Sequence, residues 1–229
     1  MSRLGFALFA ATSLLVAVAS LRVLVLPMDL VMQNMAHFVR DAPWRLWGHI
    51  LGGPLALALA PLQMWTGFQR RWPRLHRWSG RVYGLAVLVA GVAGLTLAPI
   101  ADASVFAQSG FVVLALLWLG TTAIGIWAAL RGRYARHQWW MQRSLALTFT
   151  AVTLRVIMAP LLIAGWTVAQ TYDVTAWGAW VLNLAVLEIA SRTAKRAPGR
   201  RFFGPDGAGK EIRTLDPDEI RQGMGALNP

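Results

Sequence analysis

Long apolar runs, each able to cross a lipid bilayer, constrain the fold of this chain more than any other feature. A transmembrane helix needs about 20 mostly apolar residues, because the hydrocarbon core is about 30 Å thick and a helix rises about 1.5 Å per residue. Such runs predict six spans, at residues 4–26, 46–68, 82–99, 111–130, 144–166 and 175–191. The predicted fold is an all-α, polytopic transmembrane helix bundle.

The composition agrees with a membrane protein. Of 229 residues, 56% are hydrophobic and 14% are charged, whereas about 25% charged residues is typical of soluble domains. We therefore predict one membrane domain over residues 1–192 and a basic cytoplasmic tail with a short helix over 193–229. The absence of cysteine excludes disulfides, iron–sulfur clusters and thiolate metal sites.

Arginine is concentrated after the second and fourth predicted spans and in the tail. By the positive-inside rule these segments lie in the cytoplasm, and an even number of spans places both termini there as well. The predicted location is a bacterial cytoplasmic membrane, with the basic residues near anionic lipid headgroups. The net charge of +12 is thus a sign of topology and not of nucleic-acid binding.

The first span has a second interpretation, as a secretory signal peptide. Arg3, the apolar run and the small residues Ala17 and Ala19 resemble a signal with its cleavage site. An uncleaved helix is favoured, because apolar residues continue to Leu26 and an even number of spans pairs the helices into hairpins.

Small residues predict that the second and third spans pack closely. Lipid supplies no net hydrophobic drive between helices, so close approach depends on small side chains along one face. The small residues of the two spans are Gly52, Ala56 and Ala60, and Ala86, Ala90, Gly94 and Ala98. The alternative explanation is that alanine and glycine are common in all membrane spans.

Arg155 is predicted to lie near the middle of the fifth span. An arginine at this depth costs about 2.5 to 3.5 kcal/mol on insertion scales, so it needs partners. Asn183 is expected at similar depth, and Glu188 lies closer to the cytoplasm, within reach of a long side chain. The sequence predicts an Arg155–Glu188 ion pair, which would either join two helices or form a transport site.

Histidines suggest a cofactor site. His76 and His137 each precede a predicted span at its cytoplasmic end, and neutral imidazoles at equal depth fit bis-histidine ligation of haem b. Nearby Arg81 and Arg143 are candidates for binding its propionates, and His49 lies nearer the outer face. His37, in the first loop, could fold back toward it.

The same histidines have a simpler explanation as interfacial anchors among arginine and tryptophan. The two basic segments also resemble copies of one unit, which hints at duplicated helical hairpins. No set of residues has the spacing of a catalytic site, so an enzyme is not predicted. The phosphate-loop-like segment 204–211 has Glu211 where magnesium binding needs Ser or Thr, and no strand precedes it.

From His49 to Arg192 the chain resembles a widespread family of predicted bacterial membrane proteins known only as a domain of unknown function. The residues that carry the resemblance are His49, Gly52, 61–63, 74–83, 117–122, His137, Trp140, Met141, Arg143, Ser144, 147–149, 153–155, Trp180, Asn183, Leu184 and Glu188. The resemblance implies a multi-pass membrane protein but no activity. The family pattern has arginine after the second motif histidine, whereas Gln138 follows His137 here.

Three functional classes follow. The first is a haem-binding or redox-linked membrane protein that uses His76 and His137. The second is a transporter of a small solute or ion that uses Arg155 and Glu188. The third is a scaffold or accessory subunit, which would bind other membrane proteins or a second copy of itself.

Overall fold

The computed structural model describes residues 2–27 and 36–196. All regular structure within these residues is helical, which confirms the predicted all-α class. The helices are α1 (Arg3–Ser20), η1 (Leu21–Leu24), α3 (Ala36–Asp41), α4 (Pro43–Met64), α5 (Thr66–Arg71), α6 (Pro73–Leu97), η3 (Ala98–Ile100), α7 (Val105–Leu130), α8 (Tyr134–Thr148), α9 (Thr150–Ile163) and α10 (Val168–Arg196). The short helix predicted in the tail and the phosphate-loop-like segment lie outside the described residues.

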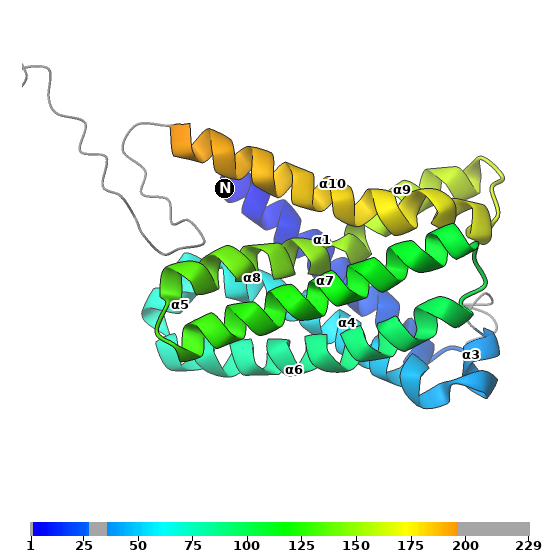
Figure 1. Ribbon diagram of the computed structural model, residues 1–229, viewed down its shortest axis with the longest axis horizontal. Coiled ribbons are helices and arrows are strands. Elements are labelled where there is room, and N and C mark those ends of the chain that lie inside the picture. Colours follow the sequence, from blue (N-terminus) through cyan, green and yellow to red (C-terminus); the bar gives the residue numbers. More distant parts are fainter. Residues whose placement is uncertain (1, 28–35, 197–229) are drawn as a thin grey trace, which may run out of the picture.

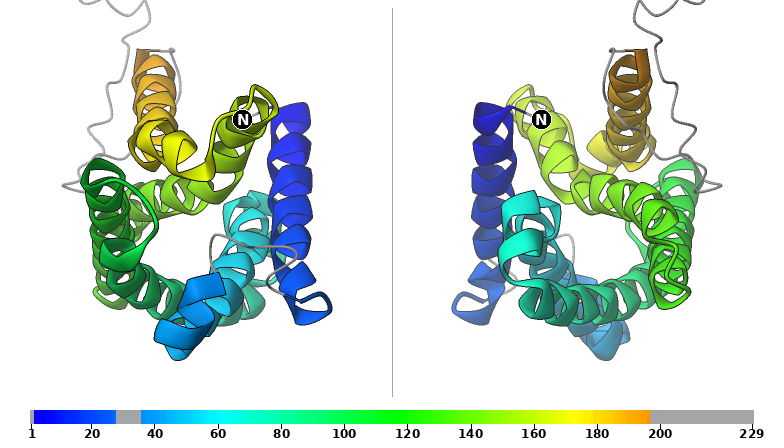
Figure 2. Two further views of the ribbon diagram at one scale, coloured as in Figure 1. Left: turned by 90° about the vertical axis from the view of Figure 1, so that its right-hand side faces the viewer. Right: turned by 90° about the vertical axis from the view of Figure 1, so that its left-hand side faces the viewer.

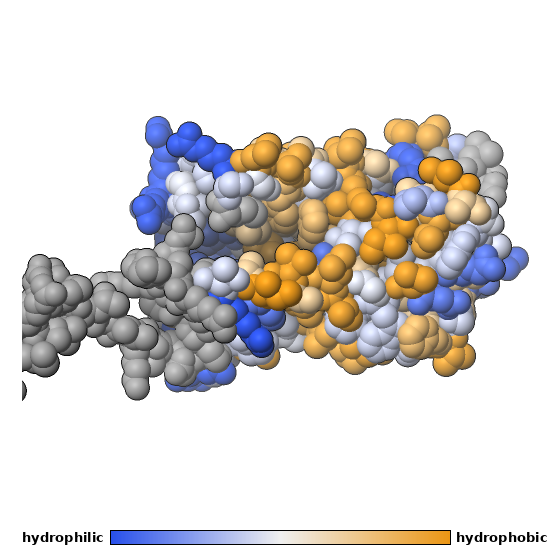
Figure 3. Space-filling model, turned by 90° about the horizontal axis from the view of Figure 1, so that it is seen from above, coloured by the Kyte–Doolittle hydropathy of each residue, from blue (hydrophilic) through white to orange (hydrophobic). Residues whose placement is uncertain are grey.

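The long helices lie side by side and alternate in direction (Figure 1). We call one end of the bundle the basic end, because Arg70, Arg71 and Arg133 lie in its connections. In Figure 1, α1 begins and α10 ends at the basic end, where α6 and α8 also begin. The opposite end carries Asp41 and Asp102. Hydrophobic residues gather between two hydrophilic ends (Figure 3), as expected for a bundle that spans a bilayer.

Five helical segments among the described residues are long and apolar enough to span a membrane: Arg3–Leu24, Pro73–Ile100, Val105–Leu130, Tyr134–Ile163 and Val168–Thr193. The remaining predicted span corresponds to α4, which has the length but contains His49, Pro54, Pro61 and Gln63. Pro54, Pro61 and Gln63 are buried, as are several other residues of α4. A helix covered by protein needs less apolar surface than one that faces lipid, so the sixth crossing remains a prediction.

The predicted close pair is confirmed. The contact between α4 and α6 is the most extensive helix contact, and Ala56, Ala60, Ala86 and Ala90 share one buried cluster. A Cβ atom added at Gly52 would lie 2.9 Å from the Ala86 carbonyl oxygen and 3.0 Å from the Ala90 Cβ. The small stripe therefore brings the two backbones together, as the spacing predicted.

Helix α1 packs beside α4 and α9 (Figure 2). Ala17, one of the residues that resemble a cleavage site, is 3% exposed and clusters with Leu57 and Val152. Cleavage of the chain here would remove this contact. The burial agrees with the interpretation of α1 as an uncleaved helix, which remains a prediction.

Candidate functional site

His76 and His137 occupy equivalent positions at the basic end. Each is the fourth residue of its helix, α6 from Pro73 and α8 from Tyr134. Both helices begin well before the predicted spans, so the histidines lie within helices and not ahead of them. The two imidazoles are close enough to interact electrostatically. The structure thus brings together the two histidines that the sequence paired.

A deeper contact fixes the orientation of these two helices. Tyr83 lies seven residues after His76, and Ser144 lies seven residues after His137. The Tyr83 hydroxyl is 2.7 Å from the Ser144 Oγ. Seven residues are about two helical turns, so each histidine shares a face with the residue that makes this contact. Since α6 and α8 run in the same direction (Figure 1), the histidines lie at similar depth, and the ring of His76 packs edge-on against Phe68 of α5 with 6.5 Å between ring centroids.

The hydrogen bond of His137 determines which ring nitrogen is available. Its Nδ1 lies 2.8 Å from the carbonyl oxygen of Gly125 on α7, so Nδ1–H is the donor. In the neutral ring the lone pair then belongs to Nε2, the usual state of a histidine that ligates a metal. Helix α8 approaches closely here, since a Cβ at Gly125 would lie 2.6 Å from the Met141 sulfur.

Unsatisfied donors surround the two histidines. Of the five buried side-chain polar atoms in the described chain that have no hydrogen-bond partner, three belong to this region: His76 Nδ1, Arg136 Nε and Trp140 Nε1. Arg136 and Trp140 lie one turn apart on α8, on either side of His137. A buried polar group without a partner costs about 1–3 kcal/mol, so such a group calls for an explanation.

The two arginines proposed for propionates have other contacts. The Arg81 guanidinium stacks on Trp78, with 5.7 Å between its Cζ and the ring centroid. Arg143 is 8% exposed and forms a short ion pair with Glu188 of α10. It also donates to the Trp139 carbonyl oxygen at 2.8 Å.

The predicted Arg155–Glu188 ion pair is therefore wrong. Glu188 binds Arg143, whereas Arg155 donates to the Ala151 carbonyl oxygen at 2.8 Å and to Ser20 Oγ at 3.2 Å. Helix α9 carries Arg155 toward the opposite end of the bundle, away from the part of α10 that holds Glu188. The depth of Arg155 in its span did not predict its partner, because the side chain extends toward α1 and not toward α10.

Asn183 connects α10 to the junction between α8 and α9. Its Nδ2 donates to the Ala146 carbonyl oxygen at 3.1 Å, and its Oδ1 accepts from Thr153 at 2.8 Å. Phe149 is a single turn residue between the two helices, and its backbone stays in the right-handed helical region. Asn183 therefore joins α10 to this junction through a carbonyl oxygen and a hydroxyl group.

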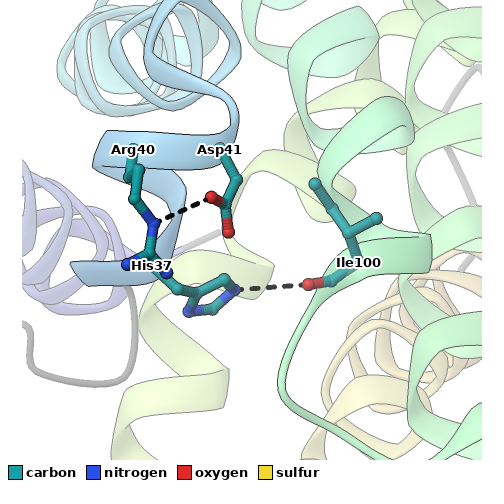
Figure 4. A network of polar contacts seen from close by, with 4 residues as sticks. All are labelled: His37, Arg40, Asp41 and Ile100. Atoms are coloured by element: carbon teal, nitrogen blue, oxygen red, sulfur yellow. Dashed lines mark hydrogen bonds and ion pairs between the residues drawn. The ribbon is translucent and has the colours of Figure 1, made fainter.

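The outer histidines lie apart. His49 Nδ1 is 3.1 Å from the Ala90 carbonyl oxygen, across the contact between α4 and α6. His37, on α3, has its Nε2 3.3 Å from the carbonyl oxygen of Ile100, beside the exposed Arg40–Asp41 ion pair (Figure 4). These bonds join each histidine to backbone and not to the other histidine.

Comparison with known proteins places this arrangement in a family. Residues 46–191, more than half of the chain, match the family described as "Predicted membrane protein (DUF2306)". The chain belongs to the DUF2306 family. No curated protein and no solved structure matches the chain. The family resemblance expected from the sequence is confirmed.

The DUF2306 region runs from within α4 to within α10. It includes both histidines at the basic end, the Arg143–Glu188 pair and Arg155, while α1 and His37 precede it. Its two most extensive helix contacts are α4 with α6 and α7 with α8. Each pair is joined at the basic end, which is the arrangement expected of duplicated hairpins, although duplication itself stays a prediction.

Sequence reasoning missed a buried hydroxyl network in the DUF2306 region. Thr148 Oγ1 accepts from Trp118 Nε1 at 2.9 Å and lies 2.7 Å from the Tyr83 hydroxyl. Ser144 Oγ lies 2.7 Å from the same hydroxyl and 2.6 Å from Thr122 Oγ1. Thr148 donates to the Ser144 carbonyl oxygen and Thr122 donates to the Trp118 carbonyl oxygen, so Tyr83 is the donor to Thr148. Every hydroxyl is satisfied, and the network joins α6, α7 and α8.

Proposed function

We propose that this DUF2306 protein binds haem b between His76 and His137 and carries electrons in the bacterial cytoplasmic membrane. The observation that carries the proposal is the seven-residue spacing of both histidines from the bonded pair Tyr83 and Ser144. This spacing supports two imidazoles at similar depth at the basic end. Axial ligation of a membrane haem by two histidines requires that arrangement.

The protonation of His137 supports the same assignment. Its Nδ1–H is held by a backbone carbonyl, which leaves Nε2 as the ligating atom. Bound haem would supply one-electron chemistry, while the chain holds it in place and keeps water away.

The unsatisfied donors also support an anionic group at this site. Arg136 Nε and Trp140 Nε1 are buried without partners next to His137. A haem propionate would satisfy such donors through charge-assisted bonds. Arg136 therefore joins Arg81 as a proposed propionate ligand in place of Arg143, because Arg143 is paired with Glu188. Arg81 and Arg136 each stack on a tryptophan, which leaves their charges without a carboxylate partner among the described residues.

An absorption spectrum tests this proposal. Protein expressed with a haem supply and purified in detergent is expected to have a Soret band and a reduced-minus-oxidised difference spectrum of a b-type cytochrome. His76→Ala and His137→Ala should each lose most of the bound haem, while His37→Ala, at the opposite end, should retain it. A colourless wild-type protein, or Soret bands of full height in both variants, would rule out this site.

We further propose that the basic end faces the cytoplasm, together with both termini. The positive-inside rule supports this orientation, since the basic connections and the described ends of α1 and α10 share one end of the bundle. This prediction concerns topology alone and holds with or without haem.

Cysteine labelling tests the orientation cleanly, because the natural chain has no cysteine. In intact cells a membrane-impermeant maleimide should label Asp41→Cys, whereas Arg70→Cys should react only after lysis. Both positions are exposed. The unsubstituted protein is the control, and the reverse labelling pattern would invert the proposed topology.

A further inference from the structure

Arg155 has an unusual environment in the half of the bundle away from the basic end. It extends from α9 toward α1, where its Nη2 donates to Ser20. It also interacts electrostatically with His49 on α4, Tyr172 on α10 and Arg22 on η1. Since these groups come from different elements, Arg155 is enclosed on several sides, yet its side chain remains exposed.

The charge of Arg155 has no carboxylate partner among residues 2–27 and 36–196. The ion pairs in these ranges are Arg40–Asp41 and Arg143–Glu188. Asp173 accepts from Ser104, on the connection before α7. Within these residues the hydrogen-bond partners of Arg155 are instead a hydroxyl and a carbonyl, both neutral.

Several of its donors also have no acceptor in the described part of the chain. A guanidinium has five N–H groups, and the two hydrogen bonds of Arg155 occupy one on each terminal nitrogen. Within residues 2–27 and 36–196, the Nε and the second hydrogen on each Nη have no acceptor. An arginine at membrane depth without a counter-charge is unfavourable, and such residues mark ligand or ion sites.

We propose that Arg155 binds an oxyanion, the carboxylate or phosphate group of a small solute or of a lipid, which enters from the end that carries Asp102. The planar fork of the guanidinium matches two oxygens of either group. Ser20 accepts from Arg155 and donates its own hydrogen to the Val16 carbonyl oxygen at 2.7 Å, so Arg155 itself supplies the donors for the ligand.

Thermal unfolding with defined anions tests the site. The wild-type protein in neutral detergent is heated in sodium phosphate, in sodium acetate and in sodium chloride of equal ionic strength. It is also heated in nanodiscs of phosphatidylcholine alone and in nanodiscs that contain phosphatidylglycerol. A ligand at a hundredfold excess over its Kd should raise Tm by about 5 °C. The variants are Arg155→Gln and Arg155→Lys, with Arg40→Gln as a control because Arg40 lies at the same end in an exposed ion pair.

A rise in phosphate or acetate over chloride, lost in Arg155→Gln, reduced in Arg155→Lys and kept in Arg40→Gln, supports a site for free oxyanions. A rise confined to phosphatidylglycerol nanodiscs, with the same dependence on Arg155, assigns the site to a lipid phosphate. The inference is overturned if no condition stabilises the wild-type protein, or if the stabilisation persists in Arg155→Gln. If Arg155→Gln fails to fold, the comparison of Arg155→Lys with Arg40→Gln decides, and an unstabilised wild-type protein overturns the inference in any case.

Discussion

Glu188→Ala is expected to destabilise the bundle by about 2 kcal/mol, because it leaves the Arg143 guanidinium without its counter-charge inside the membrane domain. Breaking a fully buried ion pair costs about 3–5 kcal/mol. The side chain of Arg143 is 9% exposed but that of Glu188 is 41% exposed, so the expected loss lies below that range. Thermal or denaturant unfolding of the detergent-purified protein measures it.

The double variant Arg143→Met with Glu188→Leu separates charge from packing. It removes both charges together, so it should recover most of the stability that Glu188→Ala loses. Asp41→Ala is the matched control, because its ion pair with Arg40 is exposed and is expected to contribute little. A Glu188→Ala protein as stable as the Asp41→Ala protein would contradict the burial of this pair.

Gly52→Ala is expected to destabilise the protein, although alanine is the better helix former. The added methyl group would lie 2.9 Å from a carbonyl oxygen of α6. Because this oxygen belongs to the backbone of a helix, it cannot move away as a flexible side chain would. Overpacking of this kind costs about 1–3 kcal/mol, against a gain in helix propensity of about 1 kcal/mol.

The neighbouring Gly53 is a matched control, since a Cβ there would meet nothing within 4 Å. Gly53→Ala has the same change in propensity without the clash and should be neutral or stabilising. The difference in Tm between the two variants therefore reports the approach of α4 to α6. Equal melting temperatures would mean that the two helices are not in close contact at Gly52.

The sequence was sufficient to predict features that depend on one segment at a time. The apolar runs predicted the helices, and the spacing of small residues predicted the contact at Gly52. The equal depth of His76 and His137 was also predictable, because both follow basic turns at one end of the bundle. Helix α4 was harder to classify, since its His49 and two prolines suit a protein-covered helix and not a lipid-facing one.

Features that depend on the rotation of one helix against another were not predictable. The helix that contains His137 begins at Tyr134, ahead of the apolar run, and this start directs Arg143 inward to Glu188. If Arg143 is assumed to lie at the membrane–water interface, Arg155 is the remaining arginine that could pair with Glu188. This pairing proved wrong. The Tyr83 network was missed for the same reason, because serine and threonine in an apolar run carry no signal of their partners.

The turn at Phe149 joins α8 and α9 with little loss of helical bonding. Phe149 N–H donates to the Leu145 carbonyl oxygen at 2.9 Å, and Thr153 N–H donates to the Phe149 carbonyl oxygen at 3.2 Å. The backbone of Phe149 itself lies in the right-handed helical region. The segments that carry His137 and Arg155 are therefore parts of one continuous rod, so a tilt of either segment moves the other.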